Sequence, residues 1–361
     1  MGSVFLDGNE AIARAAMAAG CNFFAGYPIT PATSIFHHML DLLPPIGGVC
    51  LQGEDEIASI GFCLGAAAGG ARVMTATSGP GISLFSEQIS FAIAAEIPIV
   101  IVDVQRLGPS TGSATKGADG DIQFLRWGNS GGLPVIVLAP SDVSEAYTLT
   151  IKAFDLAEQY RCPVFIASNK EVGMTRECVD LTVVSSDRCL HKQTPKPPDN
   201  DVSTGVDKSQ QFLRMTSSTH GKDNYITTDP AVIEQAIEGL ESKLVSIGGD
   251  SSCCILDEQQ IDTTILIVYG VTARAAREAV MSLRADGYKI SLLVVKTLYP
   301  VPEREIASAV SGKEKIVVLE MNRGQYVLEI QRLSGIVPVH FYGQMNGELM
   351  SPETIIREVV Q

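Results

Sequence analysis

Apolar runs alternate with helical patterns along the first half of the chain. Strands are predicted at residues 21–27, 48–52, 72–77 and 97–104, and helices at 11–20, 32–43, 55–70 and 81–96. The fourth of these strands, IPIVIVDV, has no polar alternation, which is typical of a parallel strand covered on both faces. Two more strands, at 134–140 and 162–168, flank a helix that begins near Ser141 and Asp142. The pattern predicts an α/β fold built on a parallel sheet.

The second half begins with a break in this pattern. Periodicity fails between about 186 and 232, where Pro, Asp, Ser and Lys dominate, so we interpret this stretch as a linker or an exposed excursion. A helix is predicted near 230–244, and a strand–helix–strand unit at 263–300 is followed by a strand at 315–322. We therefore expect a first domain at 1–185, a linker with a helix at 186–260, and a smaller α/β domain at 261–361.

Composition narrows the function classes. The net charge of −14 and the pI of about 4.8 argue against nucleic acid or an anionic membrane as partner. None of the eight cysteines forms a CxxC pair, which excludes zinc-ribbon and iron–sulfur spacings and favours a reducing cytoplasm. The N-terminal stretch lacks the features of a signal peptide, and the longest apolar run is too short to span a bilayer.

The first candidate for chemistry is GYPITPATSI, which follows a predicted strand. Pro28 and Pro31 restrict the backbone around Ile29 and Thr30. Thr30 would then present its hydroxyl from a stiff loop beside a helix N-terminus, an environment that favours anions. The alternative is a purely structural helix entry, with Pro31 as the first helical residue.

Two further segments also join a strand to a helix. In LQGEDEIAS, Glu56 is followed by an apolar helix, which predicts a desolvated carboxyl group; the alternative is that it only complements the helix dipole. In TSGPGISL, Gly79, Pro80 and Gly81 form a tight turn that a ligand can approach closely. The P-loop spacing is missing there, so a plain turn is equally consistent.

The fourth segment is the long polar loop at 105–121. Arg106 stands at the end of a buried strand, where its guanidinium is suited to a carboxylate, and Lys116 offers a second cation or is simply solvated. A GxGxxG motif after the first strand and a GxSxG elbow are both missing, and the histidines show no metal spacing. We expect no metal site on this chain.

Together the four segments resemble, in the same order, the α subunit of 2-oxoacid:ferredoxin oxidoreductases, most closely the 2-oxoglutarate type. GYPITPAT resembles the family's YPITPS-type substrate loop, and GEDEIAS resembles the segment with the glutamate that activates thiamine diphosphate. RVMTATSGPG is similar to the TSTSGPG stretch, and QRLGPSTG resembles RGGPSTG. The likeness extends through GNEAIARAAMAAG, WGNSGG, APSDVSEA and EMNRGQ, and so covers most of the chain.

The resemblance implies a pyrimidine-type thiamine-diphosphate-binding domain followed by a transketolase C-terminal-like α/β domain. It implies that Glu56 hydrogen-bonds the aminopyrimidine ring and thereby generates the ylid, that Thr30 contacts the 2-oxoacid, and that Arg106 pairs with a substrate carboxylate. The implied substrate-binding residues are Tyr27, Pro28, Ile29, Thr30, Arg106, Ser110, Thr111 and Lys116. The implied cofactor-binding residues are Glu56, Ser78, Gly79, Pro80 and Gly81.

The resemblance also implies partners. A β subunit would hold the diphosphate and Mg²⁺ with a GDG motif and carry a [4Fe–4S] cluster, in a dimer of heteromers with ferredoxin as acceptor and CoA as cosubstrate; any γ domain would be a separate chain. Leu107 replaces the family's glycine, and SATKGADGD departs from its usual continuation. Branched-chain 2-oxoacids and pyruvate therefore stay open as substrates, as does the direction of the reaction. A non-oxidative thiamine enzyme and a non-catalytic assembly subunit are the rival interpretations.

Overall fold

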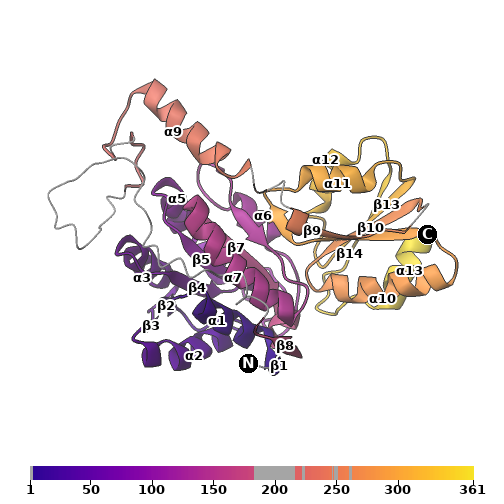
Figure 1. Ribbon diagram of the computed structural model, residues 1–361, viewed down its shortest axis with the longest axis horizontal. Helices are drawn as coiled ribbons and strands as arrows, with labels where there is room; N and C mark the ends of the chain where they lie inside the picture. The colour runs from indigo at the N-terminus through magenta and orange to yellow at the C-terminus, as the bar shows by residue number, and fades with distance from the viewer. Residues whose placement is uncertain (1–2, 183–215, 222–223, 246, 248–250, 260–261) are drawn as a thin grey trace.

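The computed structural model describes residues 3–182, 216–221, 224–245, 247, 251–259 and 262–361. These residues form a seven-stranded, a five-stranded and a two-stranded sheet, with helices packed on the two larger ones (Figure 1). Most of the excursion predicted at 186–232 lies outside the described residues. Among the described helices, none is long and apolar enough to cross a bilayer.

The seven-stranded sheet has the strand order β12-β6-β7-β5-β4-β2-β3. Its strands are β2 (Phe23–Gly26), β3 (Val49–Gln52), β4 (Val73–Thr77), β5 (Ile99–Gln105), β6 (Ile136–Leu138), β7 (Pro163–Asn169) and β12 (Thr297–Tyr299). All neighbours pair in parallel except β12 and β6. Along β5, Val100 and Val102 face one buried cluster and Ile99 and Ile101 face the other. The predicted two-sided parallel sheet is confirmed.

Helices cover both faces of this sheet. On one face lie α1 (Gly8–Ala18), α2 (Thr33–Leu42) and α7 (Val143–Tyr160), and on the other lie α3 (Glu56–Ala68), α4 (Gly79–Leu84) and α5 (Ser86–Ala94). The single helix predicted at 81–96 is thus two helices, α4 and α5, which meet at the buried Phe85. Shorter segments are η1 (Pro44–Ile46), α6 (Ile122–Trp127) and α8 (Lys170–Met174).

The five-stranded sheet has the order β14-β13-β10-β11-β9. Its strands are β9 (Cys254–Asp257), β10 (Thr264–Tyr269), β11 (Ile290–Val295), β13 (Lys315–Glu320) and β14 (Val339–Gly343). Helices α10 (Thr272–Ala285) and α13 (Pro352–Val360) cover one face, and α11 (Glu303–Val310) and α12 (Val327–Leu333) cover the other (Figure 1). Only β9 runs antiparallel to its neighbour.

The predicted strand–helix–strand unit at 263–300 reaches both large sheets. Strand β11 pairs with β10, but β12 pairs with β6 in the seven-stranded sheet. Between them, the Nζ of Lys296 lies 2.7 Å from a carboxylate oxygen of Glu145 on α7. A continuous apolar run in the sequence does not show where the chain leaves one sheet for the other, so only the pairing separates β11 from β12.

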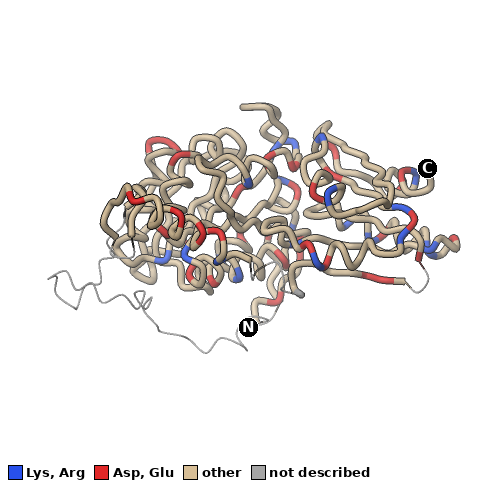
Figure 2. The backbone as a smooth tube through the Cα atoms, turned by 90° about the horizontal axis from the view of Figure 1, so that it is seen from above, with Lys and Arg blue, Asp and Glu red and all other residues tan. Residues whose placement is uncertain are grey.

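The remaining described elements are β1 (Ser3–Asp7), β8 (Arg176–Asp180), α9 (Pro230–Ser242) and the short helix η3 (Ser251–Cys253). Strands β1 and β8 pair antiparallel. Helix α9 begins as predicted, with the Asp229 side chain accepting a hydrogen bond from the backbone N–H of Ala231. Helix α9 stands at the edge of the molecule in Figure 1, and none of its residues is buried. Acidic and basic residues are interspersed over both halves of the described chain (Figure 2).

Candidate active site

The four predicted segments follow four adjacent strands of the seven-stranded sheet. The order β5-β4-β2-β3 is continuous, and all four strands run in the same direction. Their carboxyl ends carry, in that order, the loop that begins at Arg106, the turn at residues 78–81, the loop at 27–31 and the start of α3. Carboxyl ends of adjacent parallel strands are where open α/β sheets bind ligands, so the fold gathers all four segments at one edge.

Glu56 is the first residue of α3, and its residue exposure is only 8%. Asp55 caps the helix, with its side chain accepting a hydrogen bond of 2.7 Å from the backbone N–H of Ala58. The two neighbouring acids therefore have different environments. Asp55 satisfies the helix terminus, while the carboxyl group of Glu56 is buried against the next segment.

That next segment is the turn after β4. A Cβ atom added to Gly81 would lie 2.8 Å from the Cγ of Glu56 and 2.0 Å from the Oγ1 of Thr77. Only glycine leaves room there for the Glu56 side chain. The hydroxyl groups of Thr77 and Ser78 are buried and have no hydrogen-bond partner among the described residues. The turn thus places two buried hydroxyl groups that lack described partners near the buried carboxyl group of Glu56.

Arg106 connects the segments after β5 and β2. One of its terminal nitrogens donates a hydrogen bond of 2.6 Å to the backbone carbonyl of Thr30. The Arg106 residue is 6% exposed, and its Nε has no hydrogen-bond partner among the described residues. Thr30 itself is exposed, so the hydroxyl predicted to contact a ligand is accessible. Tyr27 is also exposed, and Pro28 and Ile29 between them are half-buried.

The loop after Arg106 is a closed excursion. Backbone hydrogen bonds join Leu107 to Lys116 at 2.8 Å and Ser113 to Leu107 at 3.0 Å. Ser110 and Thr111 lie at its exposed tip. A Cβ atom on Gly347 would lie 2.8 Å from the Cβ of Lys116, so that side chain passes close to the segment after β14. All three predicted residues are exposed, in contrast to the buried Glu56.

Sequence reasoning missed Asn9 as a support for the proline loop. Its side-chain amide donates hydrogen bonds of 2.9 Å to the carbonyl of Pro31 and 2.7 Å to the hydroxyl of Ser34. Asn9 is fully buried at the start of α1. The only sequence signal was an asparagine near the start of an Ala-rich helix.

Three buried acids beneath the site were missed as well. Burial raises the pKa of Asp119 to about 7, although a hydrogen bond from Asn169 opposes the shift. Burial likewise raises the pKa of Asp121 to about 6, while contact with Asp103 and the charge of Arg106 lower it. For Asp103 burial is again the main cause, and the nearby acids add to it, so its pKa lies well above the usual range.

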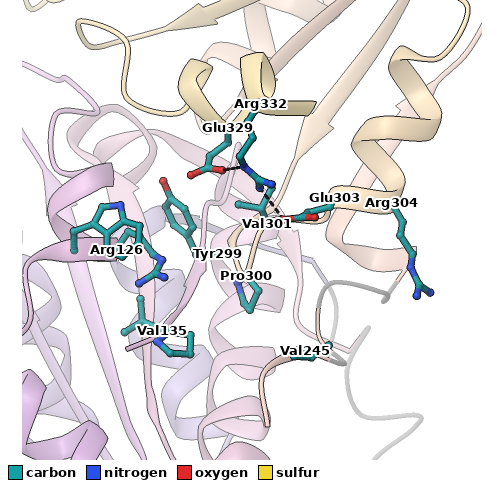
Figure 3. Close-up of a pocket in the computed structure, with 12 residues that line it drawn as sticks. Arg126, Val135, Val245, Tyr299, Pro300, Val301, Glu303, Arg304, Glu329 and Arg332 are labelled. Carbon is teal, nitrogen blue, oxygen red and sulfur yellow. Dashed lines mark hydrogen bonds and ion pairs between the residues drawn. The ribbon is translucent and has the colours of Figure 1, made fainter. Parts of the chain in front are cut away.

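A separate pocket of about 860 Å³ lies beside β12 (Figure 3). None of the predicted site residues lines it. Two of its arginines are already engaged: Arg332 pairs with Glu303 at 2.7 Å and Glu329 at 3.0 Å, and the Arg126 guanidinium lies 3.7 Å from the ring centroid of Trp127. We therefore place the candidate chemistry at the strand ends and not in this pocket.

Comparison with known proteins shows which protein families this chain is similar to. Residues 14–238 match the family described as pyruvate flavodoxin/ferredoxin oxidoreductase, thiamine diP-bdg. Residues 263–355 match pyruvate:ferredoxin oxidoreductase core domain II. The chain belongs to the 2-oxoacid:ferredoxin oxidoreductase family. Both parts of the expected fold class, the thiamine-diphosphate-binding domain and the smaller α/β domain, are confirmed for this family member.

Among relatives in the 2-oxoacid:ferredoxin oxidoreductase family, 2-oxoglutarate synthase subunit KorA of Methanothermobacter marburgensis is 37% identical over 374 residues, covering 99% of this chain and 98% of the relative. Ketoisovalerate oxidoreductase subunit VorB of Methanothermobacter thermautotrophicus is 34% identical over 367 residues, covering 99% of this chain and 97% of the relative. Both likenesses extend over essentially the full length of this chain.

A solved structure in the same family is also similar. It is 2-oxoglutarate:ferredoxin oxidoreductase from Magnetococcus marinus, determined with 2-oxoglutarate, coenzyme A and succinyl-CoA bound. The TM-score is 0.88 at 29% identity over 99% of this chain. This chain spans 65% of the length of that chain.

Proposed function

We propose that the chain is the α subunit of a 2-oxoglutarate:ferredoxin oxidoreductase. The reaction is CoA-dependent oxidative decarboxylation of the 2-oxoacid to an acyl-CoA, with transfer of the electrons to ferredoxin. One observation carries the proposal: the Glu56 carboxyl group lies against Gly81 at the same sheet edge where Arg106 holds the Thr30 carbonyl. A buried acid and a buried guanidinium are the two groups that such a reaction needs from this chain.

The residues at the strand ends fit thiamine diphosphate. Gly81 leaves a cradle that a Cβ would fill, and the Thr77 and Ser78 hydroxyl groups are buried without partners among the described residues. Gly79 and Pro80 complete the turn that would approach the cofactor. The cofactor supplies the electron sink for decarboxylation, and the protein binds and orients it.

Each of the predicted residues has a proposed task. Glu56 would share a proton with a basic ring nitrogen of the cofactor, because its buried carboxyl group has little competing water. Arg106 would pair with a carboxylate of the substrate, and Thr30 would contact the 2-oxoacid from a loop that Asn9 and Arg106 hold in place. Tyr27, Pro28 and Ile29, in the same loop as Thr30, would line the substrate site.

The exposed loop has a more peripheral proposed task. Ser110, Thr111 and Lys116 would meet the distal part of the substrate or the cosubstrate, since all three are exposed on the loop that follows Arg106.

We further propose the expected partners. A β subunit would contribute Mg²⁺, the diphosphate site with its GDG motif and a [4Fe–4S] cluster, in a dimer of heteromers in the cytoplasm. A γ subunit would be a further partner. We propose a first domain at 1–185, a linker with a helix at 186–260 and a second domain at 261–361. Strand β12 of the second domain pairs with β6 in the first sheet.

The substrate has a second candidate. A branched-chain 2-oxoacid is favoured by the 34% identity to a ketoisovalerate oxidoreductase subunit, close to the 37% found for the 2-oxoglutarate synthase subunit. We place 2-oxoglutarate first because the relative with the higher identity and the solved structure both carry that name. Substrate choice would depend on the loop that follows Arg106.

The test is co-expression with the gene for its β subunit and measurement of viologen reduction with CoA and a panel of 2-oxoacids. We expect reduction with 2-oxoglutarate to exceed that with 2-oxoisovalerate and pyruvate. Faster reduction with 2-oxoisovalerate would support the second candidate. If no 2-oxoacid is oxidised by a complex that binds thiamine diphosphate and holds its cluster, the non-catalytic assembly subunit becomes the better interpretation.

A further inference from the structure

Two buried carboxyl groups lie against each other beneath the candidate active site. Asp103 points from β5 into the protein and is 0% exposed, and neither of its carboxylate oxygens has a hydrogen-bond donor among the described residues. Two residues later, on the same face of β5, the side chain of Gln105 accepts a hydrogen bond of 2.9 Å from the backbone N–H of Asp121. This hydrogen bond holds Asp121 beside the end of β5, where the buried oxygens of Asp103 and the Oδ2 of Asp121 lack donors among the described residues and the two side chains are close enough to hydrogen-bond each other.

Two carboxylates in contact inside a protein cannot both carry a charge unless cations or donors compensate them. The charged groups around this pair are few. Asp119 adds a further acid from the same loop, and of these three aspartates Glu320 acts on Asp119. Among the described residues, Arg106 is the cation that acts on the pair, through Asp121. A single proton removes the repulsion between the two carboxylates, because the protonated carboxylic acid donates a hydrogen bond to the ionised one, as in other acid pairs that titrate together.

We propose that Asp103 and Asp121 form an acid pair that shares one proton. Asp103 is protonated and donates a hydrogen bond to the carboxylate of Asp121. Asp103 is the protonated member because it is the more deeply buried of the two, whereas Asp121 is only partly buried and the charge of Arg106 favours its ionised form. The pair then carries one negative charge instead of two. Asp121 presents that charge in a fixed position at the sheet edge.

The fixed charge lies between two predicted site segments. The Oδ2 of Asp121 lies 3.7 Å from the position that a Cβ on Gly79 would occupy, and this oxygen has no donor among the described residues. Asp121 therefore lies beside the turn after β4 and near enough to the arginine after β5 to feel its charge. We therefore assign Asp103 and Asp121 as positioning residues. The single negative charge of the pair orients Arg106, whereas a second negative charge would repel an anionic substrate bound next to Arg106. This part of the argument rests on the proposed function, because it assigns the substrate carboxylate to Arg106.

Infrared spectroscopy of the full chain tests the shared proton without any need for turnover. At about pH 8.5, Asp119 and Asp121 are ionised, so we expect one protonated-carboxyl stretching band that shifts in D₂O. The band should disappear in Asp103→Asn and persist in the matched control Asp119→Asn. No such band in the wild-type chain would overturn the proposal, and so would a band that survives Asp103→Asn.

Kinetics of the assembled complex provide the second test. Asp103→Asn keeps a hydrogen-bond donor toward Asp121 and keeps one negative charge on the pair, so the KM for 2-oxoglutarate should change by less than about threefold. A larger change in that KM, with the KM for CoA unaffected, would mean that Asp103 carries a charge in the native protein and would overturn the proposal. If the complex turns over no 2-oxoacid, the proposed function fails, and the infrared result still decides the protonation of the pair.

Discussion

At the scale of single residues, the site depends on charged groups that are buried more than their types usually are. Glu56 and Arg106 are 8% and 6% exposed. Arg106 comes directly after β5, and Glu56 is the first residue of α3, which follows β3, so the backbone of these elements sets their positions. Burial of an ionisable group costs free energy, and such groups cluster at functional sites, so Glu56 and Arg106 are the first residues to test.

Glu56→Gln keeps the size of the side chain against Gly81 but cannot accept or return a proton. We expect kcat to fall by about 10² to 10⁴-fold, the range typical of losing a general acid or base, with thiamine diphosphate affinity almost unchanged. The measurements are viologen reduction by the complex and cofactor binding by calorimetry. Turnover near the wild-type rate would show that Glu56 has only a structural role.

Arg106→Ala removes the buried guanidinium and its hydrogen bond to Thr30. Hydrogen bonds to charged groups contribute about 1.5 to 3 kcal/mol, so kcat/KM for 2-oxoglutarate should fall by about 10 to 100-fold. The KM for CoA should not change. Arg284→Ala is a control on the second sheet, where the arginine pairs with Asp257 at 3.0 Å. An equal loss in both variants would indicate a general defect of folding.

At the scale of elements, the turn between β4 and α4 packs against Glu56. Helix α4 has only six residues and starts at Gly79, so it brings the backbone of Gly81 close to the side chain of another helix, α3. The contact joins two residues 25 positions apart in the sequence. Such a close approach of backbone to side chain requires glycine, because any Cβ would overlap its neighbours.

Gly81→Ala should therefore disturb the site directly. The added Cβ would lie 2.0 Å from the Oγ1 of Thr77 and 2.8 Å from the Cγ of Glu56, and overpacking of this kind costs about 1 to 3 kcal/mol. We expect lower thermal stability and loss of viologen reduction. Gly239→Ala, in α9, has no atom within 4 Å of its added Cβ and should be neutral or slightly stabilising. A fully active Gly81→Ala enzyme would contradict the close contact.

At the scale of the whole molecule, the two large sheets are joined by polar contacts as well as by β12. The side chain of Asn322, after β13, donates a hydrogen bond of 2.8 Å to the carbonyl of Asp119, and the side chain of Gln325 accepts one of 2.8 Å from the backbone N–H of Gln123. Asp119 in the loop after β5 is thus buried, with hydrogen bonds from Asn169 at the end of β7 and from Asn322 after β13. Its burial makes the stability of the whole chain depend on pH.

The dependence has a definite sign. The pKa of Asp119 is about 7 in the folded chain and 3.8 in its usual range, so the folded state binds more protons than the unfolded state between these values. The contribution of Asp119 to the free energy of unfolding therefore falls as pH rises from about 4 to 7, by at most about 1.4 kcal/mol per pH unit. Asp119→Asn should reduce this decline. Urea unfolding of both chains at about pH 5, 6 and 7 measures it, and parallel pH profiles would exclude the effect.

The sequence predicted the local elements of the site well, because each depends on neighbouring residues. Apolar runs marked the strands, and the residues after them marked the four segments. The pattern did not predict the break at Phe85 or the passage of β12 into the other sheet, since a continuous apolar stretch has the same appearance in either arrangement. Nor did it predict that Asn9 would support the loop at Pro31, 22 residues away.

The sequence by itself determined the two-sided parallel sheet and the residue types at its strand ends, because unbroken apolar strands must be covered on both faces and their ends must turn. Only the tertiary structure decided which strand ends are neighbours, since strand order follows from how the crossovers pack. It also decided that Asp103 meets Asp121, because their contact and the burial that raises the pKa of both depend on surroundings drawn from several strands and loops.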